Sequence, residues 1–226
     1  MVPSHLSLMP NTVRFYGLAR NLHEAPIIIP DDTEVWISNN FKSYYNVRLP
    51  RLNETNEWTR WFNLHSTEHM KTKYPDGYKW YKHQTKPIYL RDVDPDIPTS
   101  LRFPRQEIQD HFGGPQMGSP GRFFTCSVCW LTAFAIYEKE IGIKDWDRFE
   151  FWGFALVEKP ARSHTCYKFE RPCFFYWVNE AKKRGIEVIY QEAIQKLPFE
   201  PGDPKTYTGP LYGYCTNEPF DPCCKE

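Results

Sequence analysis

The sequence has no excess charge of either sign. Its 28 Lys and Arg residues balance 28 Asp and Glu residues among 226 positions. A chain this neutral lacks the overall positive field of a non-specific nucleic-acid binder, although a local basic groove stays open as an alternative.

Long apolar stretches are missing as well. No run approaches the roughly 18 apolar residues that a membrane helix needs, and residues 1–15 have neither a basic segment nor a long apolar one. We therefore expect no signal peptide, no membrane partner and a cytoplasmic location. The seven cysteines are irregularly spaced, which fits reduced thiols in that compartment.

Aromatic residues, in contrast, are abundant. They make up 17% of the chain, and apolar residues as a whole make up 41%. Most of the rings are expected to fill a core, and a minority to stack on a ligand base or sugar. The length suits one domain, which we place at residues 1–197. Residues 198–226 hold six of the twenty prolines and are expected to form an extended tail.

Strand and helix patterns alternate along the chain. Apolar and β-branched runs predict strands at 12–18, 34–38, 59–65, 87–90, 148–154 and 186–190. Periodicity and capping residues predict a short turn or helical piece at 19–25 and helices at 104–112, 127–140 and 172–184, the last with Pro172 at its first position. Residues 66–86 are expected to form a loop, and the glycine-rich segment 111–122 a lid-like connection. The alternation predicts an α/β fold with a Rossmann-like, mainly parallel sheet and helices on both faces.

Ligands of such sheets bind at the carboxyl ends of the strands. Three features are predicted to meet there: the turn at 17–21, the pair Asn39 and Asn40, and the helix start at 125–127. A glycine turn admits a phosphate to the backbone, amides bridge a base or sugar hydroxyl, and a helix start attracts an anion. Each also has an ordinary structural explanation, namely a tight turn, left-handed turn residues and a helix cap. No G-K-[ST] phosphate loop occurs in the chain.

The polar segment 158–172 lies between a predicted strand and helix on the same side. It holds His164 as a candidate base, and Tyr167 and Arg171 as candidate ligands of a leaving phosphate. Its structural alternative is a solvated loop. His65, which ends the third predicted strand, is a second candidate base, or else a histidine at the rim of the core.

Cys126 and Cys129 form a C-x-x-C motif. Zinc would need two more ligands, and Cys166 with Cys173 is the nearest supply. Because the pair falls in a helix that is predicted to be buried, we interpret these residues as structural thiols and expect no metal.

The order of these pieces resembles the bacterial sialyltransferase-like fold and phage proteins that share its pattern. The resemblance spans roughly residues 12–197. It rests on the glycine turn at 17–22, the strand-ending asparagines at 39–40, the Thr125-Cys126-Ser127 turn, the strand with Gly153, the Glu170-Arg171-Pro172 step and the Gly185-Ile186-Glu187-Val188 strand. Two departures stand out, because Cys126 replaces a serine and Phe154-Ala155 stands where the family has an acidic residue.

The resemblance implies transfer of a sugar from a nucleotide donor without a metal or another cofactor. The donor would contact Gly17, Ala19, Asn21, Asn39, Asn40, Thr125, Cys126, Ser127 and Gly153. His164 or His65 would act as the base, with Tyr167 and Arg171 on the phosphate. The acceptor is open, with a glycan or a modified DNA base as examples, and so is the oligomeric state.

Two rival interpretations remain. A pyrophosphokinase of related fold would need magnesium, and therefore an acidic cluster beside the Gly17 turn. Its suppliers would be Asp31, Asp32, Asp92, Asp94 and Asp96. A non-catalytic nucleotide-binding protein would keep the fold without the reaction, and the missing acid after Gly153 favours it.

Overall fold

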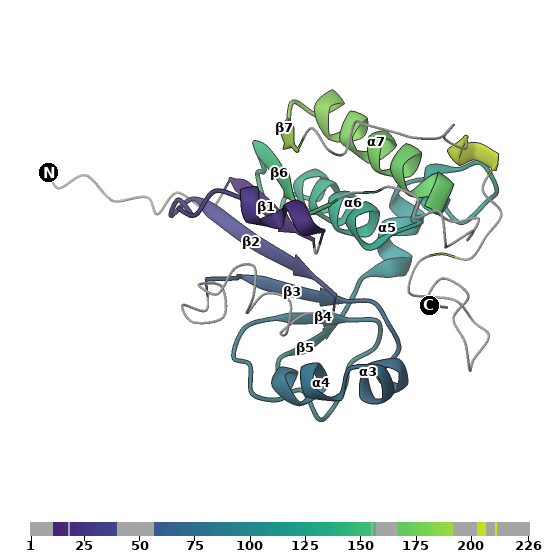
Figure 1. The fold of residues 1–226 in the computed structure, drawn as a ribbon. Helices are drawn as coiled ribbons and strands as arrows, with labels where there is room; N and C mark the ends of the chain where they lie inside the picture. The colour runs from purple at the N-terminus through teal and green to yellow at the C-terminus, as the bar shows by residue number, and fades with distance from the viewer. Residues whose placement is uncertain are drawn as a thin grey trace, which may run out of the picture.

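The sheet of the computed structural model contains seven parallel strands. The structure describes residues 11–17, 19–39, 57–154, 156, 167–191, 203–206 and 211. Within these residues the strands are β1 (Thr12–Tyr16), β2 (Thr33–Ser38), β3 (Arg60–Asn63), β4 (Ile88–Leu90), β5 (Ser100–Arg102), β6 (Arg148–Trp152) and β7 (Glu187–Tyr190). They lie in the order β5-β4-β3-β2-β1-β6-β7, and every pair is parallel (Figure 1). The predicted α/β class and Rossmann-like sheet are confirmed.

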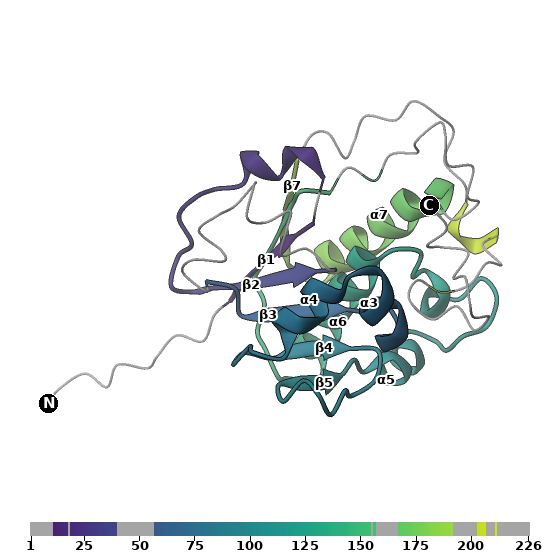
Figure 2. The ribbon, with the colours of Figure 1, turned by 60° about the horizontal axis from the view of Figure 1, so that its bottom comes forward.

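Helices cover both faces of this sheet. The α-helices among the described residues are α3 (Thr67–Lys73), α4 (Pro75–Tyr81), α5 (Arg105–His111), α6 (Ser127–Glu140) and α7 (Tyr167–Lys183). Short 3-10 helices are η1 (Arg20–Glu24), η2 (Pro120–Arg122) and η4 (Pro204–Thr206). Helices α5, α6 and α7 lie on one side of the sheet, with α3 and α4 on the other (Figures 1 and 2).

Side chains that alternate along the strands supply both layers of the core. In β1, Val13 and Phe15 pack with α6 and α7, whereas Tyr16 packs with the opposite layer. All five residues of β1 are buried. Burial on both faces explains why the strands appear in the sequence as nearly continuous apolar runs.

Rings fill most of the larger layer. Phe15 stacks on Phe151 with centroids 4.6 Å apart, and Phe124 stacks between Trp130 and Trp177 at 3.7 and 5.1 Å. This confirms the expected use of aromatic residues in the core, where each ring removes a large apolar area from water.

Residues 66–86, which we predicted to be a loop, contain α3 and α4. Ser66 caps α3 by accepting the His69 N–H, and Pro75 opens α4. Each helix has only seven residues. Such a short helix shows too few apolar repeats to produce a clear period, and it is stabilised mainly by packing on the sheet. Strand β5, with three residues, was missed for the same reason.

Helix α7 begins earlier than predicted. It starts at Tyr167, so Pro172 lies inside the helix instead of at its first position. Because proline has no N–H, the carbonyl of Lys168 loses its usual helical donor. The Glu170-Arg171 segment, expected in a loop, therefore belongs to a helix.

The glycine-rich segment predicted to be lid-like folds back on α5. Gln109 Nε2 donates to the Gly121 carbonyl at 2.9 Å, and its own carbonyl accepts the Gly114 N–H at 2.7 Å. A side chain at Gly121 would collide with the Gly114 backbone. These contacts fix the segment against the helix.

Most of the predicted tail lies outside the described residues. No helix in the described part of the chain is long and apolar enough to cross a bilayer.

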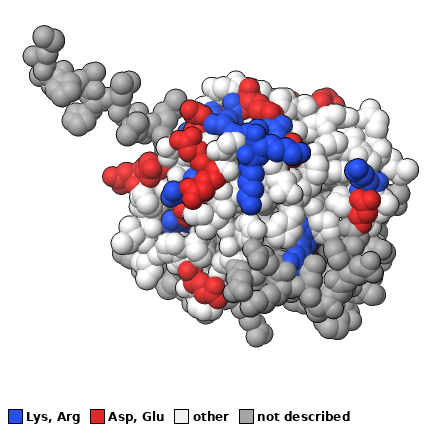
Figure 3. Space-filling view, turned by 90° about the horizontal axis from the view of Figure 1, so that it is seen from above, with Lys and Arg blue, Asp and Glu red and all other residues white. Residues whose placement is uncertain are grey.

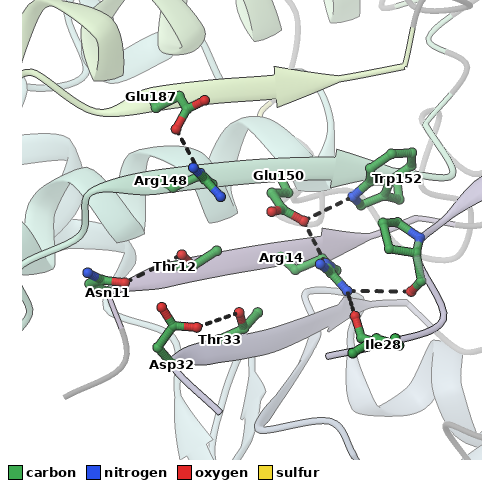
Figure 4. Close-up of polar contacts among 11 residues, drawn as sticks. Asn11, Thr12, Arg14, Ile28, Asp32, Thr33, Arg148, Glu150, Trp152 and Glu187 are labelled. Carbon is green, nitrogen blue, oxygen red and sulfur yellow. Dashed lines mark hydrogen bonds and ion pairs between the residues drawn. The ribbon is translucent and has the colours of Figure 1, made fainter. Parts of the chain in front are cut away.

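A buried ion pair links the neighbouring strands β1 and β6 on the face opposite α6. Arg14 Nε lies 2.7 Å from Glu150 Oε2, and Arg14 Nη1 donates to the Ile28 carbonyl at 3.1 Å (Figure 4). Trp152 Nε1 donates to the same carboxylate oxygen at 3.4 Å. These contacts hold β1, β6 and the segment before β2 together at the middle of the two strands.

Candidate functional site

The strand order reverses between β1 and β6, and a Rossmann-like sheet usually opens a ligand crevice there. In this chain the two strand ends stay bonded beyond the strands. Gly17 N–H donates to the Trp152 carbonyl at 2.8 Å, and Ala19 N–H donates to the Gly153 carbonyl at 2.7 Å. The backbone is therefore closed for the first residues after both strands.

The two glycines make this closure sterically feasible. A Cβ at Gly17 would lie 2.5 Å from the Gly153 oxygen and 2.6 Å from the Phe154 ring. A Cβ at Gly153 would lie 2.7 Å from the Gly17 oxygen, and its φ of +74° is also unfavourable for other residues. The space left by Gly17 thus receives the protein's own chain, although we predicted close approach of a ligand there.

The end of β2 meets the start of α6, as predicted. Asn39 Nδ2 donates to Ser127 Oγ in a long hydrogen bond of 3.5 Å. Asn39 adopts a left-handed φ of 74°. Its carbonyl accepts Trp61 Nε1 at 2.8 Å and the Tyr81 hydroxyl at 3.2 Å. These two hydrogen bonds hold the backbone carbonyl of Asn39 and so stabilise the less common backbone conformation of this residue.

The start of α6 is buried and polar. Cys126 is the N-cap residue in extended conformation, and its side chain makes no capping hydrogen bond. Thr125 and Ser127 are 2% and 8% exposed. The Thr125 hydroxyl has no hydrogen-bond partner of ordinary geometry among the described residues. Because the first N–H groups of a helix lack intrahelical acceptors, this helix start can receive an anion.

Arg171 is a buried cation without a described counter-charge. The residue is 5% exposed, and its Nη1 atom is buried with no hydrogen-bond partner among the described residues. The guanidinium lies 5.5 Å from the centroid of the Phe175 ring. Burial lowers its pKa, which the nearby Tyr190 partly offsets. Because α7 follows β6, its first turns lie at the carboxyl edge of the sheet, where Tyr190 ends β7.

His65 follows β3 at the same edge. Its ring stacks on His69 at 4.8 Å, and its N–H donates to Asn63 Oδ1 at 3.2 Å. The ring is half-buried. His65 thus occupies the predicted edge, and its role as a base stays a prediction.

Several predicted residues fall outside the description. Asn40 and His164 are not among the described residues, and neither are the side chains of Asn21 and Tyr167. That the remaining residues line one cavity with them stays a prediction.

Two buried side-chain amides at this edge of the sheet, those of Asn63 and Gln191, were not predicted from the sequence. Asn63 is fully buried at the end of β3, where its Nδ2 donates to the Tyr81 hydroxyl at 3.1 Å. Gln191, just after β7, accepts the Gly153 N–H at 2.8 Å and donates to Glu24 at 2.8 Å. Asn63 could have been found by the argument used for Asn39, since both end a strand. Gln191 carries no such signal, because its partners are far away in the sequence.

The five aspartates proposed as magnesium ligands do not gather beside Gly17. Asp31 and Asp32 precede β2, at the opposite end of the sheet, and Asp94 accepts the Tyr78 hydroxyl at 2.9 Å. Asp96 binds Lys82, and Asp92 lies near Arg91. No group of three potential metal ligands occurs within the described ranges.

The thiols of Cys126, Cys129 and Cys173 are free and buried. Burial of Cys126 and Cys129 agrees with the prediction that their helix is buried. Comparison of the chain with family models, with curated proteins and with solved structures finds no match.

Proposed function

We propose that the protein binds a nucleotide-activated sugar at the carboxyl edge of the sheet and transfers the sugar without a metal. The observation that carries this proposal is the isolated guanidinium of Arg171. Arg171 has no carboxylate partner and leaves its buried Nη1 atom unbonded among the described residues, and a buried charge in this state is destabilising. An anionic ligand would supply the missing partner, and a guanidinium suits the oxygens of a phosphate.

The other described residues complete such a site. Asn39 and Ser127 offer an amide and a hydroxyl beside a helix start, which suits hydroxyl groups of a ribose or sugar. His65 would take the proton from the acceptor hydroxyl, with His164 as its alternative. The resemblance to the sialyltransferase-like fold supplies the reaction class.

The acceptor is the least constrained part of the proposal. On the face seen in Figure 3, Lys and Arg side chains form one small patch that Asp and Glu side chains border, and most of the other described surface there is uncharged. Backbone binding of DNA depends on a broad basic area. We therefore favour a glycan or another uncharged hydroxyl compound over a DNA duplex.

Binding without catalysis is the second candidate. The closed backbone at Gly17 and Gly153 and the absence of the family's acidic residue at Phe154-Ala155 favour it. Thermal unfolding with CMP, UDP and sugar nucleotides in EDTA tests binding, and product analysis then separates the two candidates. Stabilisation only by ATP with magnesium would instead support the pyrophosphokinase.

Arg171→Met should separate ligand binding from stability. Without ligand the variant should be more stable by about 1–2 kcal/mol, because an unpaired buried charge is replaced by an apolar group. The stabilisation by nucleotide should disappear. Urea unfolding with and without the best nucleotide measures both effects.

Arg148→Met is the matched control. Arg148 is exposed and pairs with Glu187 at 2.7 Å on the surface, so its loss should change stability by less than about 0.5 kcal/mol. If Arg171→Met keeps the full nucleotide response, Arg171 does not bind the phosphate.

Asn39→Gly tests the amide without disturbing the backbone, because glycine accepts the positive φ of this position. We expect donor affinity to fall by about 1–3 kcal/mol, the cost of an unmet polar partner, with nearly unchanged stability. Calorimetric titration measures the affinity. Asn39→Ala is the control for strain, since it should bind equally weakly but also unfold more easily. The same loss of affinity is expected for Asn40→Ala.

A further inference from the structure

The first turn of α6 contains two thiols in contact. Cys126 Sγ and Cys129 Sγ are 3.3 Å apart. The Cys129 N–H donates to the Cys126 carbonyl at 3.2 Å, so both residues belong to one closed turn. A disulfide needs the sulfur atoms to approach to about 2.05 Å. A small side-chain rotation can supply that change, since C-x-x-C places both residues on the same turn.

The two cysteines are not equivalent. Cys126 is the N-cap residue, and at 6% exposure it is the more accessible of the two. Cys129 is fully buried, and burial raises the pKa of its thiol well above the ordinary value. This arrangement makes Cys126 the attacking residue and Cys129 the residue that completes the bond.

A third thiol is close to the pair. Cys173 on α7 is fully buried, and burial raises the pKa of its thiol to about 12 while Thr125 lowers it slightly. At neutral pH such a thiol stays protonated and reacts slowly. Cys173 is therefore a bystander, and it provides an internal control.

We propose that Cys126 and Cys129 form a reversible dithiol–disulfide switch at the start of α6. The oxidant is a low-molecular-weight disulfide such as glutathione disulfide. The Cys126 thiolate attacks one of its sulfur atoms, and one glutathione leaves as a thiolate. Cys129 then loses its proton and attacks Cys126, which releases the second glutathione. In total the pair loses two protons and two electrons, and one glutathione disulfide becomes two glutathione molecules.

The switch does not depend on the proposed glycosyl transfer. It does change the turn that carries Ser127, the partner of Asn39, so the redox state reaches the candidate site. Because the test of disulfide formation uses no ligand, failure of one proposal leaves the other intact.

Peptide mapping provides a direct test. Trypsin should release residues 123–139 as one peptide, because no Lys or Arg lies between Arg122 and Lys139, and this peptide contains Cys126 and Cys129 alone among the cysteines. The folded protein is treated with glutathione disulfide, unfolded in an alkylating reagent and digested. We expect peptide 123–139 to resist alkylation and to be lighter by about 2 Da, the mass of two hydrogens. Dithiothreitol before alkylation should restore two alkylated cysteines.

Two variants sharpen the result. Cys129→Ser should leave Cys126 as a stable mixed disulfide with glutathione, whereas Cys173→Ser should leave the internal disulfide unchanged. Two alkylated cysteines in peptide 123–139 after oxidation would overturn the proposal. So would a cross-link between this peptide and the one that contains Cys173.

Discussion

Replacing Gly153 with alanine should destabilise the fold by about 3 kcal/mol. Its φ of +74° costs about 1 kcal/mol or more for an L residue, and the new methyl group would lie 2.7 Å from the Gly17 oxygen and 2.9 Å from Leu22. Overpacking of this kind adds about 1–3 kcal/mol. Urea unfolding followed by circular dichroism measures the free energy of unfolding.

Two other glycines allow the cost of a positive φ to be measured separately from the cost of a steric collision. Gly142 has almost the same φ, +73°, but a Cβ there would meet nothing within 4 Å. Gly142→Ala should therefore cost only about 1 kcal/mol. Gly17 has no positive φ, so Gly17→Ala isolates the collision. If Gly153→Ala is no worse than Gly142→Ala, the contact between the two strand ends is not tight.

Arg60→Met should cost about 3–5 kcal/mol, because it leaves buried carboxylates without their shared cation. Arg60 lies 2.9 Å from Glu34 and 2.6 Å from Glu138, above the ring of Trp36 at 4.7 Å. Glu34 would keep Lys144 at 2.6 Å. Glu138 would keep no ion pair of the described structure, and its Oε2 atom already lacks a hydrogen bond there.

The loss of stability caused by Arg60→Met should be smaller at low pH. Burial raises the pKa of Glu138 even beside Arg60, and removal of Arg60 raises it further. The folded variant then binds a proton that the unfolded chain releases near its ordinary pKa, so its stability falls as the pH rises above that value. In the unmodified protein Arg60, Lys144 and Trp36 outweigh burial and lower the pKa of Glu34, whose contribution is lost as the pH falls through that lowered pKa. The raised pKa of Glu138 therefore makes the loss of stability smaller at pH 5 than at pH 8, whereas the contribution of Glu34 is still present at both pH values because its pKa is lowered.

Chemical denaturation at both pH values measures this change. The double variant Arg60→Met/Glu138→Leu should recover much of the lost stability, because an apolar pair replaces an unpaired charge. If Arg60→Met loses the same free energy of unfolding at both pH values, Glu138 is not buried as an unpaired carboxylate.

Sequence patterns predicted the long elements well and the short ones poorly. The predicted bounds of α6 match the structure at both ends, since the helix is fourteen residues long and eleven of them are buried. The seven-residue helices α3 and α4 offered too few repeats. Pro172 was assigned to a helix start because that is its commonest helical place, yet the helix begins five residues before it.

In the candidate site too, features set by the local sequence could be predicted, whereas most contacts between distant residues could not. Residues at strand ends could be assigned to one edge, and the contact between Asn39 and Ser127, 88 positions apart, followed from that rule. The pairing of Gly17 with Gly153 could not be predicted, because a glycine shows no sign of which atom will approach it. The triad of Arg60, Glu34 and Glu138 was missed because single charged residues in strands and helices normally face water.

The bonds between the ends of β1 and β6 also restrict how the molecule can move. Gly17 and Ala19 are fastened to the chain that leaves β6, and Gln191 joins the same group from β7. These hydrogen bonds tie the exits of β1, β6 and β7 to one another, which restricts their movement relative to the sheet. Within the part of the chain that the structure describes, we therefore expect adjustment to an incoming molecule at this edge to come from the first turns of α6 and α7.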